Sequence, residues 1–305
     1  MTTYQFVTAD VFTSERFGGN PLAVFPDARG IPEDALLRIT REFNFSETTF
    51  VYPPANAANT RRVRIFTPGG EIPFAGHPTV GTAYVLASVG AIKLTGSDTR
   101  IVLEEGVGPV PVSIRAESGG GPTYSELSVA QLPETGPPPP SGASLARALG
   151  LDEADLLTGN FSPEGVSCGL PFLFVPVRDR AALGRIRLRL DEFENVMRAY
   201  WTPQVFVFCD EPERSGSNYR ARMFAPLIGV TEDPATGSAC AAFGGYLGKR
   251  DARRDGTLSW VVEQGFEMGR PSIIRVECDK SGGKITAIRV GGNSVVMTRG
   301  ELTLD

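Results

Sequence analysis

The sequence predicts an α+β protein made of two similar halves, and two observations carry that prediction. Short β-type runs, such as TTFVY at 48–52 and VFVF at 205–208, mix with amphipathic helical stretches such as residues 32–44. They do so without the regular strand–helix alternation of a doubly wound sheet. In addition, motifs of the first half recur in the second half in the same order.

The recurrence is visible in four pairs of strings. RIFTP at 64–68 matches RMFAP at 222–226, an offset of 158, and HPTVGTA at 77–83 matches DPATGSA at 233–239, an offset of 156. FVY at 50–52 matches FVF at 206–208, and GNP at 19–21 matches GLP at 169–171. Turn chemistry alone would explain the last pair, but four collinear matches favour an internal duplication. This alignment pairs His77 with Asp233.

Two breaks near the middle of the chain predict the boundary between the halves. They are the run GGGP at 119–122 and the four prolines at 137–140. Proline runs neither continue a helix nor donate to a sheet ladder, so both segments are expected to be connections. We predict an N-terminal half of residues 1–120, to which residues 290–305 return, and a C-terminal half of residues 121–289.

Composition excludes several functional classes. The net charge of -5 arises from 35 acidic and 30 basic residues without long runs of either sign, so nucleic acid is not expected as a partner. No stretch reaches about 18 unbroken apolar residues and the N-terminal segment has no signal-peptide pattern, which predicts a cytoplasmic protein without membrane spans. Four dispersed cysteines and a single histidine predict neither a metal site nor a disulfide framework.

The segments after His77 and Asp233 are both predicted to be helix N-termini. Each has a proline that suits a first helical turn, followed by small residues at 81, 83, 237 and 239 that permit close packing. The free N–H groups of a helix start attract carboxylates and oxyanions, and its positive end should lower the pKa of His77. The alternative is that these are two ordinary core helices, capped at His77 and Asp233.

Glu47 is the candidate acid/base residue. It lies between the helical stretch 32–44 and the run TTFVY, where an acidic residue is usually solvated. An unperturbed glutamate titrates near pH ~4.3, so acting as both acid and base at neutral pH requires an apolar setting or a neighbouring charge. Phe43, Phe45 and Phe50 could supply the apolar setting.

Five strings together, GGNPLAVF, SETTFV, RIFTPGGEIPFAGHPTVGTA, RMFAPLIGVTEDPATGSA and QGFEMGRPS, resemble the PhzF-like family and span positions 18–272. The resemblance implies a diaminopimelate epimerase-like fold, in which each of two pseudo-twofold-related halves wraps a curved, mostly antiparallel sheet around a central helix, with the active site between them. It also implies no metal and no organic cofactor. In the well-understood member of that family the substrate is trans-2,3-dihydro-3-hydroxyanthranilate, and the implied mechanism is removal of a proton from C3 and its delivery to C1 by one glutamate.

Residue by residue, the resemblance assigns the catalytic role to Glu47. Contacts with a small carboxylate substrate are implied for the following residues: His77, Asp233, Ser238, the backbone of Gly76 and Gly237, and Asn20.

Two alternatives remain at this stage. Epimerases and racemases of this fold use a thiol at each helix start, but neither start contains one, and Cys240 is expected on the helix body as a small buried apolar residue. That epimerase, racemase or dehydratase reading would require a second acid/base group. A non-catalytic binding protein would keep the site without turnover.

We also expect a homodimer, because of the resemblance and because open, strand-rich halves have edges that need covering. Light scattering at micromolar concentration should give about twice the chain mass of 32.7 kDa. A mass equal to that of the single chain would contradict this prediction.

Overall fold

The computed structural model describes residues 1–117 and 120–305, in two compact units. Unit 1 contains residues 1–130 and 290–305, and unit 2 contains residues 131–289. Residues 121–130, assigned from the sequence to the second half, lie in unit 1 because strand β8 (Pro122–Ser128) pairs with β7 (Gly108–Ala116). The glycine run predicted as a connection begins at Gly119, outside the described residues. The four prolines at 137–140 form a loop within unit 2.

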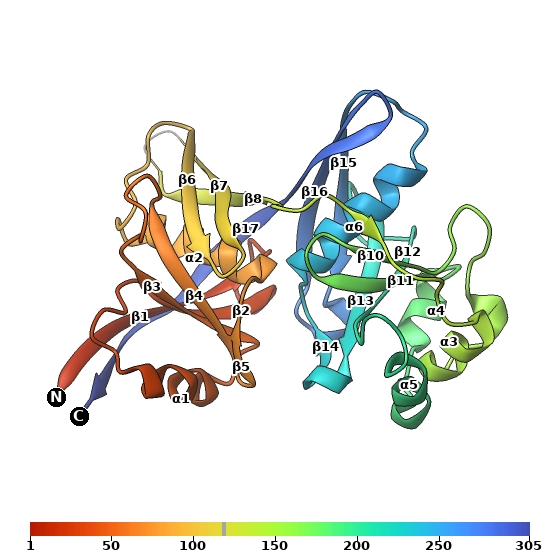
Figure 1. Ribbon diagram of the computed structural model, residues 1–305, viewed down its shortest axis with the longest axis horizontal. Coiled ribbons are helices and arrows are strands. Elements are labelled where there is room, and N and C mark those ends of the chain that lie inside the picture. Colours follow the sequence, from red (N-terminus) through yellow and green to blue (C-terminus); the bar gives the residue numbers. More distant parts are fainter. Residues whose placement is uncertain (118–119) are drawn as a thin grey trace. The chain divides into compact units, whose positions relative to one another are not determined.

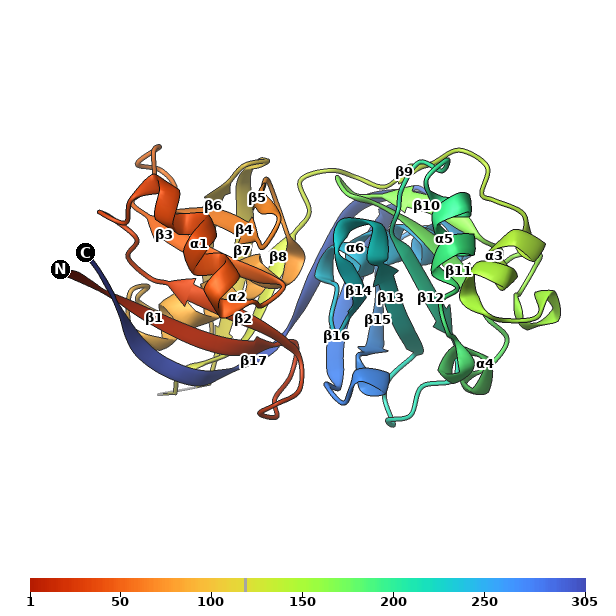
Figure 2. The same ribbon diagram turned by 90° about the horizontal axis from the view of Figure 1, so that it is seen from below.

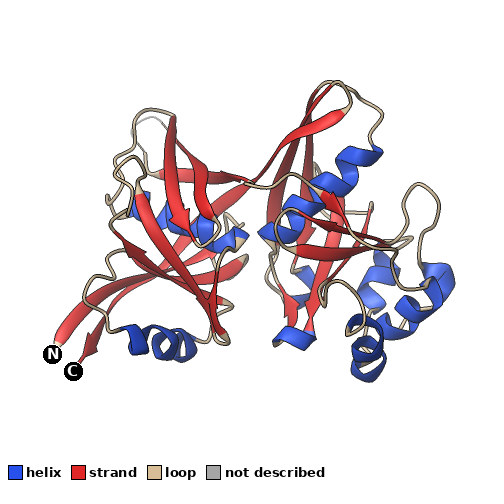
Figure 3. Cartoon of the chain, in the orientation of Figure 1, coloured by secondary structure: helices blue, strands red, loops and turns tan. Residues whose placement is uncertain are grey.

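Unit 1 is a closed sheet around one helix, α2 (Gly76–Ser88) (Figures 1 and 3). Its remaining elements are β1 (Thr2–Val11), β2 (Asn20–Phe25), α1 (Glu33–Phe43), β3 (Glu47–Tyr52), β4 (Arg61–Thr67), β5 (Gly70–Ile72), β6 (Asp98–Glu105), β7, β8 and the end of β17 (Lys284–Leu304). The pairings run β1–β2–β3–β4–β6–β7–β8–β17 and return to β1. Nearly every residue of α2 is buried, as expected of a helix enclosed by strands.

Helix α1 covers the outer face of the same sheet (Figure 2). It buries Ala35, Leu36, Ile39 and Thr40, one stripe of a helix with 3.6 residues per turn. These residues pack on Phe25, Phe50 and Phe66 from the strands. The side chain of Thr49, next to Phe50, points to the opposite face and contacts Thr82 of α2 at 2.8 Å between hydroxyls.

Unit 2 has the same plan with additional helices on its outer face. Its elements are β9 (Glu134–Thr135), α3 (Gly142–Leu149), η1 (Glu153–Asp155), β10 (Glu164–Ser167), β11 (Pro171–Pro176), α4 (Arg180–Arg185), α5 (Leu190–Met197), β12 (Val205–Cys209), β13 (Tyr219–Ala225), η2 (Pro226–Ile228), β14 (Val230–Asp233), α6 (Gly237–Arg250), β15 (Gly256–Gln264), η3 (Phe266–Met268), β16 (Ser272–Ser281) and the start of β17.

Alternation along two strands separates the two faces of unit 2. Phe174 of β11 and Phe206 and Phe208 of β12 contact Phe243 of α6. The residues between them, such as Leu173 and Val207, pack on α3, α4 and α5 instead. Because successive strand residues face opposite sides, these strands are apolar on both faces.

Strand pairing bears out the duplication but corrects its alignment. Pairs β1–β2, β2–β3, β3–β4, β4–β5, β4–β6 and β6–β7 recur in unit 2 as β10–β11, β11–β12, β12–β13, β13–β14, β13–β15 and β15–β16, each with the same parallel or antiparallel sense.

The strand register shifts the FVY match by one residue, so that Phe50 corresponds to Val207, and the larger correction falls at the helix starts. Helices α2 and α6 begin at Gly76 and Gly237, which are 161 residues apart rather than 156. His77 therefore corresponds to Ser238, and the corresponding prolines are Pro73 and Pro234, which precede the helices. Pro78 lies inside the first turn of α2 and misled the string comparison.

The close packing of α2 makes Gly81 sensitive to substitution. A Cβ atom there would lie 2.5 Å from Cγ2 of Val11 and 2.6 Å from Cδ2 of Leu22, both fully buried. We predict that Gly81→Ala lowers the free energy of unfolding by about 1–2 kcal/mol, because overpacking outweighs the gain in helix propensity. Urea denaturation checks this. Gly184→Ala in α4, where no described atom lies within 4 Å of the new methyl group, is the control and should not destabilise. Equal effects of the two changes would contradict the prediction.

Candidate active site

Glu47 and His77 come together at the start of α2. Glu47 is the first residue of β3, and His77 is the second residue of α2. His77 Nε2 lies 3.3 Å from Glu47 Oε2, and the side chains are 5% and 15% exposed. The carboxyl group is thus largely removed from water without being sealed from it.

The contact between these two side chains requires a proton. His77 hydrogen-bonds the backbone of Pro21. Because Nε2 faces Glu47, this bond belongs to Nδ1–H, which leaves Nε2 of a neutral imidazole as an acceptor. Two acceptors at 3.3 Å repel each other unless one carries a hydrogen. A hydrogen on either atom would turn this contact into a hydrogen bond.

Burial disfavours a proton on the imidazole of His77 beyond the one at Nδ1. Desolvation lowers the pKa of His77 to about 3, and the bond to Pro21 opposes this only partly. A lowered pKa of His77 agrees with the sequence-based expectation. Its main cause is burial, however, whereas the sequence analysis attributed it to the positive end of the helix.

The other predicted residues of unit 1 lie on the same two elements. Asn20 begins β2 directly before Pro21, the residue that orients His77, and is fully buried. Gly76 is the first residue of α2, where a helix has N–H groups without intrahelical partners. Its N-cap residue, Ala75, offers no side-chain hydrogen bond.

In unit 2, the predicted residues lie around the start of α6. Ser238 is half-buried at the position equivalent to His77, after Gly237. Asp233 is the last residue of β14 and is buried, and its Oδ2 accepts a hydrogen bond of 2.5 Å from the hydroxyl of Thr236. Thr236 is the N-cap residue of α6, so the alternative of helices capped at Asp233 and His77 is wrong.

The second half has no counterpart to the carboxyl group of Glu47. Glu47 lies opposite Leu22 in the parallel pair β2–β3, and Leu173 lies opposite Val205 in β11–β12. With Pro21 matched to Pro171, Glu47 corresponds to Gln204, which is buried and cannot titrate. Of these two equivalent positions, the one in unit 1 therefore holds the side chain that can take up or release a proton.

Sequence reasoning missed four polar residues that support the helix starts: Thr79 and Glu105 in unit 1, and Thr236 and Gln264 in unit 2. Thr79 donates to the carbonyl of Ala75, and Gln264 Nε2 donates to the carbonyl of Asp233. A signal was available, because Glu-Gly at 105–106 and Gln-Gly at 264–265 extend the collinear repeat at an offset of 159.

The cysteines are unsuited to proton transfer. All four are buried and reduced, and burial raises the pKa of Cys168 to about 12 and those of Cys209 and Cys278 to about 11. Cys240 lies on the body of α6, fully buried, as the sequence predicted, and burial raises the pKa of its thiol as well. Neither helix start presents a thiolate.

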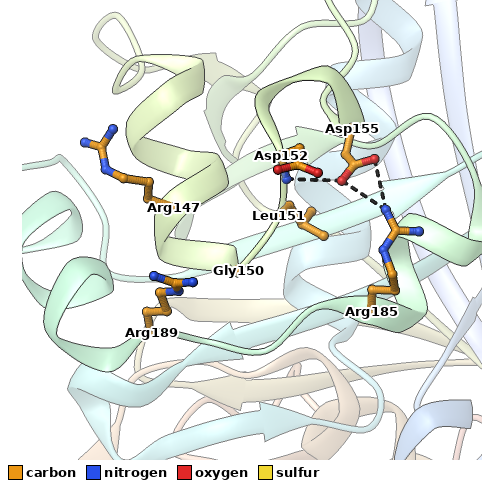
Figure 4. Close-up of a pocket in the computed structure, with 7 residues that line it drawn as sticks. All are labelled: Arg147, Gly150, Leu151, Asp152, Asp155, Arg185 and Arg189. Carbon is orange, nitrogen blue, oxygen red and sulfur yellow. Dashed lines mark hydrogen bonds and ion pairs between the residues drawn. The ribbon is translucent and has the colours of Figure 1, made fainter.

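A surface hollow of roughly 190 Å³ in unit 2 has a structural explanation (Figure 4). The buried carboxylate of Asp155 contacts Arg185 through both oxygens at 3.0 Å and Arg178 at 3.1 Å, and accepts a bond from the backbone of Asp152. These bonds tie η1 to α4. None of the predicted site residues is among the described residues that line this hollow.

Comparison with known proteins places the chain in a family. The family model PhzC-PhzF, described as phenazine biosynthesis-like protein, matches residues 9–300. The chain belongs to this family.

Individual PhzF-family proteins and isomerases match this chain over nearly its full length. The chain is 41% identical to an uncharacterized isomerase of Mesorhizobium japonicum, with 99% of each covered, and 32% identical to the trans-2,3-dihydro-3-hydroxyanthranilate isomerase of Pseudomonas aeruginosa, covering 99% of this chain and 100% of that protein. A crystal structure of a PhzF-family protein from Bacillus anthracis superposes with a TM-score of 0.86 at 26% identity, with complete coverage of both chains. The predicted fold class and the isomerase class are thereby confirmed.

Membrane-spanning helices and metal-ligand clusters are both absent from residues 1–117 and 120–305 of this PhzF-type isomerase. No helix in that part is long and apolar enough to cross a membrane. No group of three or more His, Cys, Asp or Glu side chains is arranged there to hold a metal ion.

Since His77 is the only histidine, its ionisation can be followed without ambiguity. We predict that the imidazole of the folded protein stays neutral from pH 8 down to about 5, because burial lowers its pKa to about 3. Nitrogen-15 NMR of histidine-labelled protein should show Nδ1 protonated and Nε2 bare throughout. The unfolded chain should titrate near pH ~6.5, so this group costs stability as pH falls from there toward 3. A midpoint between pH 6 and 7 in the folded protein would contradict the prediction.

Proposed function

We propose that this PhzF-type isomerase moves a proton within a small cyclic or amino-acid-like carboxylic acid, with Glu47 as its acid/base group. The observation that supports the proposal is the half-enclosed contact of Glu47 with His77, in which Oε2 and Nε2 lie 3.3 Å apart. A carboxyl group in such a pair keeps its proton long enough to donate it and gives it up readily enough to accept another, which an exposed glutamate cannot do near neutral pH.

His77 is proposed to orient this carboxyl group. The bond from Nδ1–H to Pro21 holds the ring, and Nε2 then accepts from the carboxyl O–H of Glu47. The group can present one oxygen toward a substrate carbon while the other stays on the imidazole. Proton removal at one carbon and delivery at another then needs a single carboxyl group, in keeping with glutamine at the equivalent position 204.

Substrate contacts are proposed at both helix starts. The backbone N–H groups at Gly76 and Gly237 suit a carboxylate, because each stands at the positive end of a helix. Asn20, Ser238 and Asp233 are proposed to contact hydroxyl or amino groups of the substrate. The name of the Pseudomonas aeruginosa relative leads us to propose trans-2,3-dihydro-3-hydroxyanthranilate, or a close analogue, as the compound to test first.

The test is turnover of that compound in heavy water by wild type and Glu47→Gln. The amide keeps the shape of the side chain but neither accepts nor returns a proton, so turnover and deuterium uptake should fall by about 10²–10⁴-fold while binding persists. Glu42→Gln, an exposed change on α1, is the control and should match wild type.

Three results would contradict different parts of the proposal. Wild-type exchange by Glu47→Gln would demote Glu47 to a structural residue. Binding by wild type without turnover or exchange would mean that this compound is not the substrate, and alkylation-sensitive racemisation of another acid would point to the two-thiol chemistry of racemases instead.

A further inference from the structure

Glu105, the last residue of β6, is a buried carboxyl group that the proposed chemistry does not use. It is fixed against the segment that leads into α2. Val107 N–H donates to the carbonyl of Pro73, and a Cβ atom at Gly106 would lie 2.6 Å from Cα of Pro73. The end of β6 and the entrance to α2 are therefore in direct contact.

The hydroxyl of Thr79 lies within hydrogen-bond distance of two oxygens but has one hydrogen. Thr79 Oγ1 lies 2.7 Å from the carbonyl oxygen of Ala75 and 2.7 Å from Oε1 of Glu105. A hydroxyl has one hydrogen to donate, and a carbonyl oxygen only accepts. When the threonine hydrogen goes to Ala75, the second contact is a hydrogen bond only if Glu105 supplies a proton of its own.

The surroundings of Glu105 also favour the neutral acid. Its other oxygen, Oε2, has no hydrogen-bond partner among the described residues, which would be costly for a carboxylate. Burial raises the pKa of Glu105 to about 8, against the smaller opposing effect of Thr79. The neighbouring Glu104 carboxylate is turned to the exposed loop, where Asn59 and the backbone of Ala55 donate to it. The titratable residues of α2 are His77 and Tyr84.

Unit 2 has an amide at the position equivalent to Glu105, and this amide also contacts a threonine hydroxyl at a helix start, although Thr236 is the N-cap residue and Thr79 lies in the first turn. Arg62 lies opposite Glu104, and Arg220 lies opposite Glu263, so Glu105 corresponds to Gln264. Gln264 Nε2 donates to the hydroxyl of Thr236 at 2.9 Å, and that hydroxyl donates onward to Asp233. An N–H donor that cannot ionise thus takes the place that the O–H of Glu105 takes in unit 1.

We propose that Glu105 is a positioning residue: as a neutral carboxylic acid it donates to Thr79, which donates to Ala75, and this chain holds the first turn of α2 and the imidazole of His77 in place. For catalysis, the inference rests on the proposed function. The structural part, which is the hydrogen-bond chain from Glu105 to Ala75, does not rest on the proposed function, because the NMR signals of His77 can be followed without any substrate.

The first experiment follows the His77 nitrogen signals and the Tm of wild type between pH 5 and 9.5. The folded state retains the Glu105 proton up to about pH 8, whereas the unfolded chain loses it near 4.5, so stability from this group is lost as pH rises across that interval. The His77 signals should shift with a midpoint near pH 8, and an infrared band of a protonated carboxyl should disappear with them.

Variants separate positioning from a general loss of stability. Glu105→Gln keeps an N–H donor, as Gln264 does, so its His77 signals should match those of wild type at pH 6 and stay constant to pH 9.5. The Tm difference between this variant and wild type should increase by about 4–10 °C, in favour of the variant, as the pH rises from 5 to 9. Glu105→Leu has no donor, and its His77 signals at pH 6 should resemble those of wild type at pH 9.5. Glu104→Gln is the control for a neighbouring carboxyl group and should leave the wild-type transition intact.

The outcomes distinguish this inference from the proposed function. Absence of a transition near pH 8 in wild type, or a Gln variant that behaves like the Leu variant, overturns the role of Glu105 whatever the catalytic result. A loss of exchange in Glu47→Gln tests only the acid/base assignment. The wild-type titration needs no variant, so poor folding of Glu105→Leu would not remove the test.

Discussion

Enclosure of the first turn of α2 inside the sheet of unit 1 is the constraint on which the candidate site depends. A neutral imidazole and a buried carboxylic acid both occur within a few residues of this turn. Both are consequences of removing water, because burial disfavours the charged form of each of these groups. An exposed helix start with the same side chains would hold a solvated glutamate and a histidine titrating near pH ~6.5.

The duplicated scaffold has titratable side chains at three positions of one half and non-titratable side chains at the three equivalent positions of the other, while Asp233 lies near the start of α6 at a further position. At three equivalent positions the first half has Glu47, His77 and Glu105, while the second has Gln204, Ser238 and Gln264. Backbone geometry, proline placement and glycine contacts are shared: Gly106 touches Pro73 as Gly265 touches Pro234. What differs is the capacity to gain or lose a proton, so the two helix starts are alike as hydrogen-bond donors and unlike as acid/base centres.

The sequence predicted the fold class, the duplication and the two helix starts, because recurring strings record shared backbone geometry. It misaligned the repeats by five residues at the helix start, because Pro78 and Pro234 gave a false match where Pro73 was the true partner. It did not single out Glu105, since burial of a carboxyl group is a tertiary property that neighbouring residues do not reveal. The contact of Glu47 with His77 is likewise a long-range consequence of closing the sheet.

Neutrality of the resident groups has a consequence for an anionic substrate. Burial keeps the imidazole of His77 neutral, and Glu105 as an acid adds no charge, so Glu105 does not oppose the positive end of α2. Ionisation of Glu105 would place a negative charge beside this turn and would break the hydrogen bond to Thr79. The same proton thus keeps the helix start in place and keeps it attractive to a carboxylate, which is why a buried acid, rather than a buried carboxylate, fits this position.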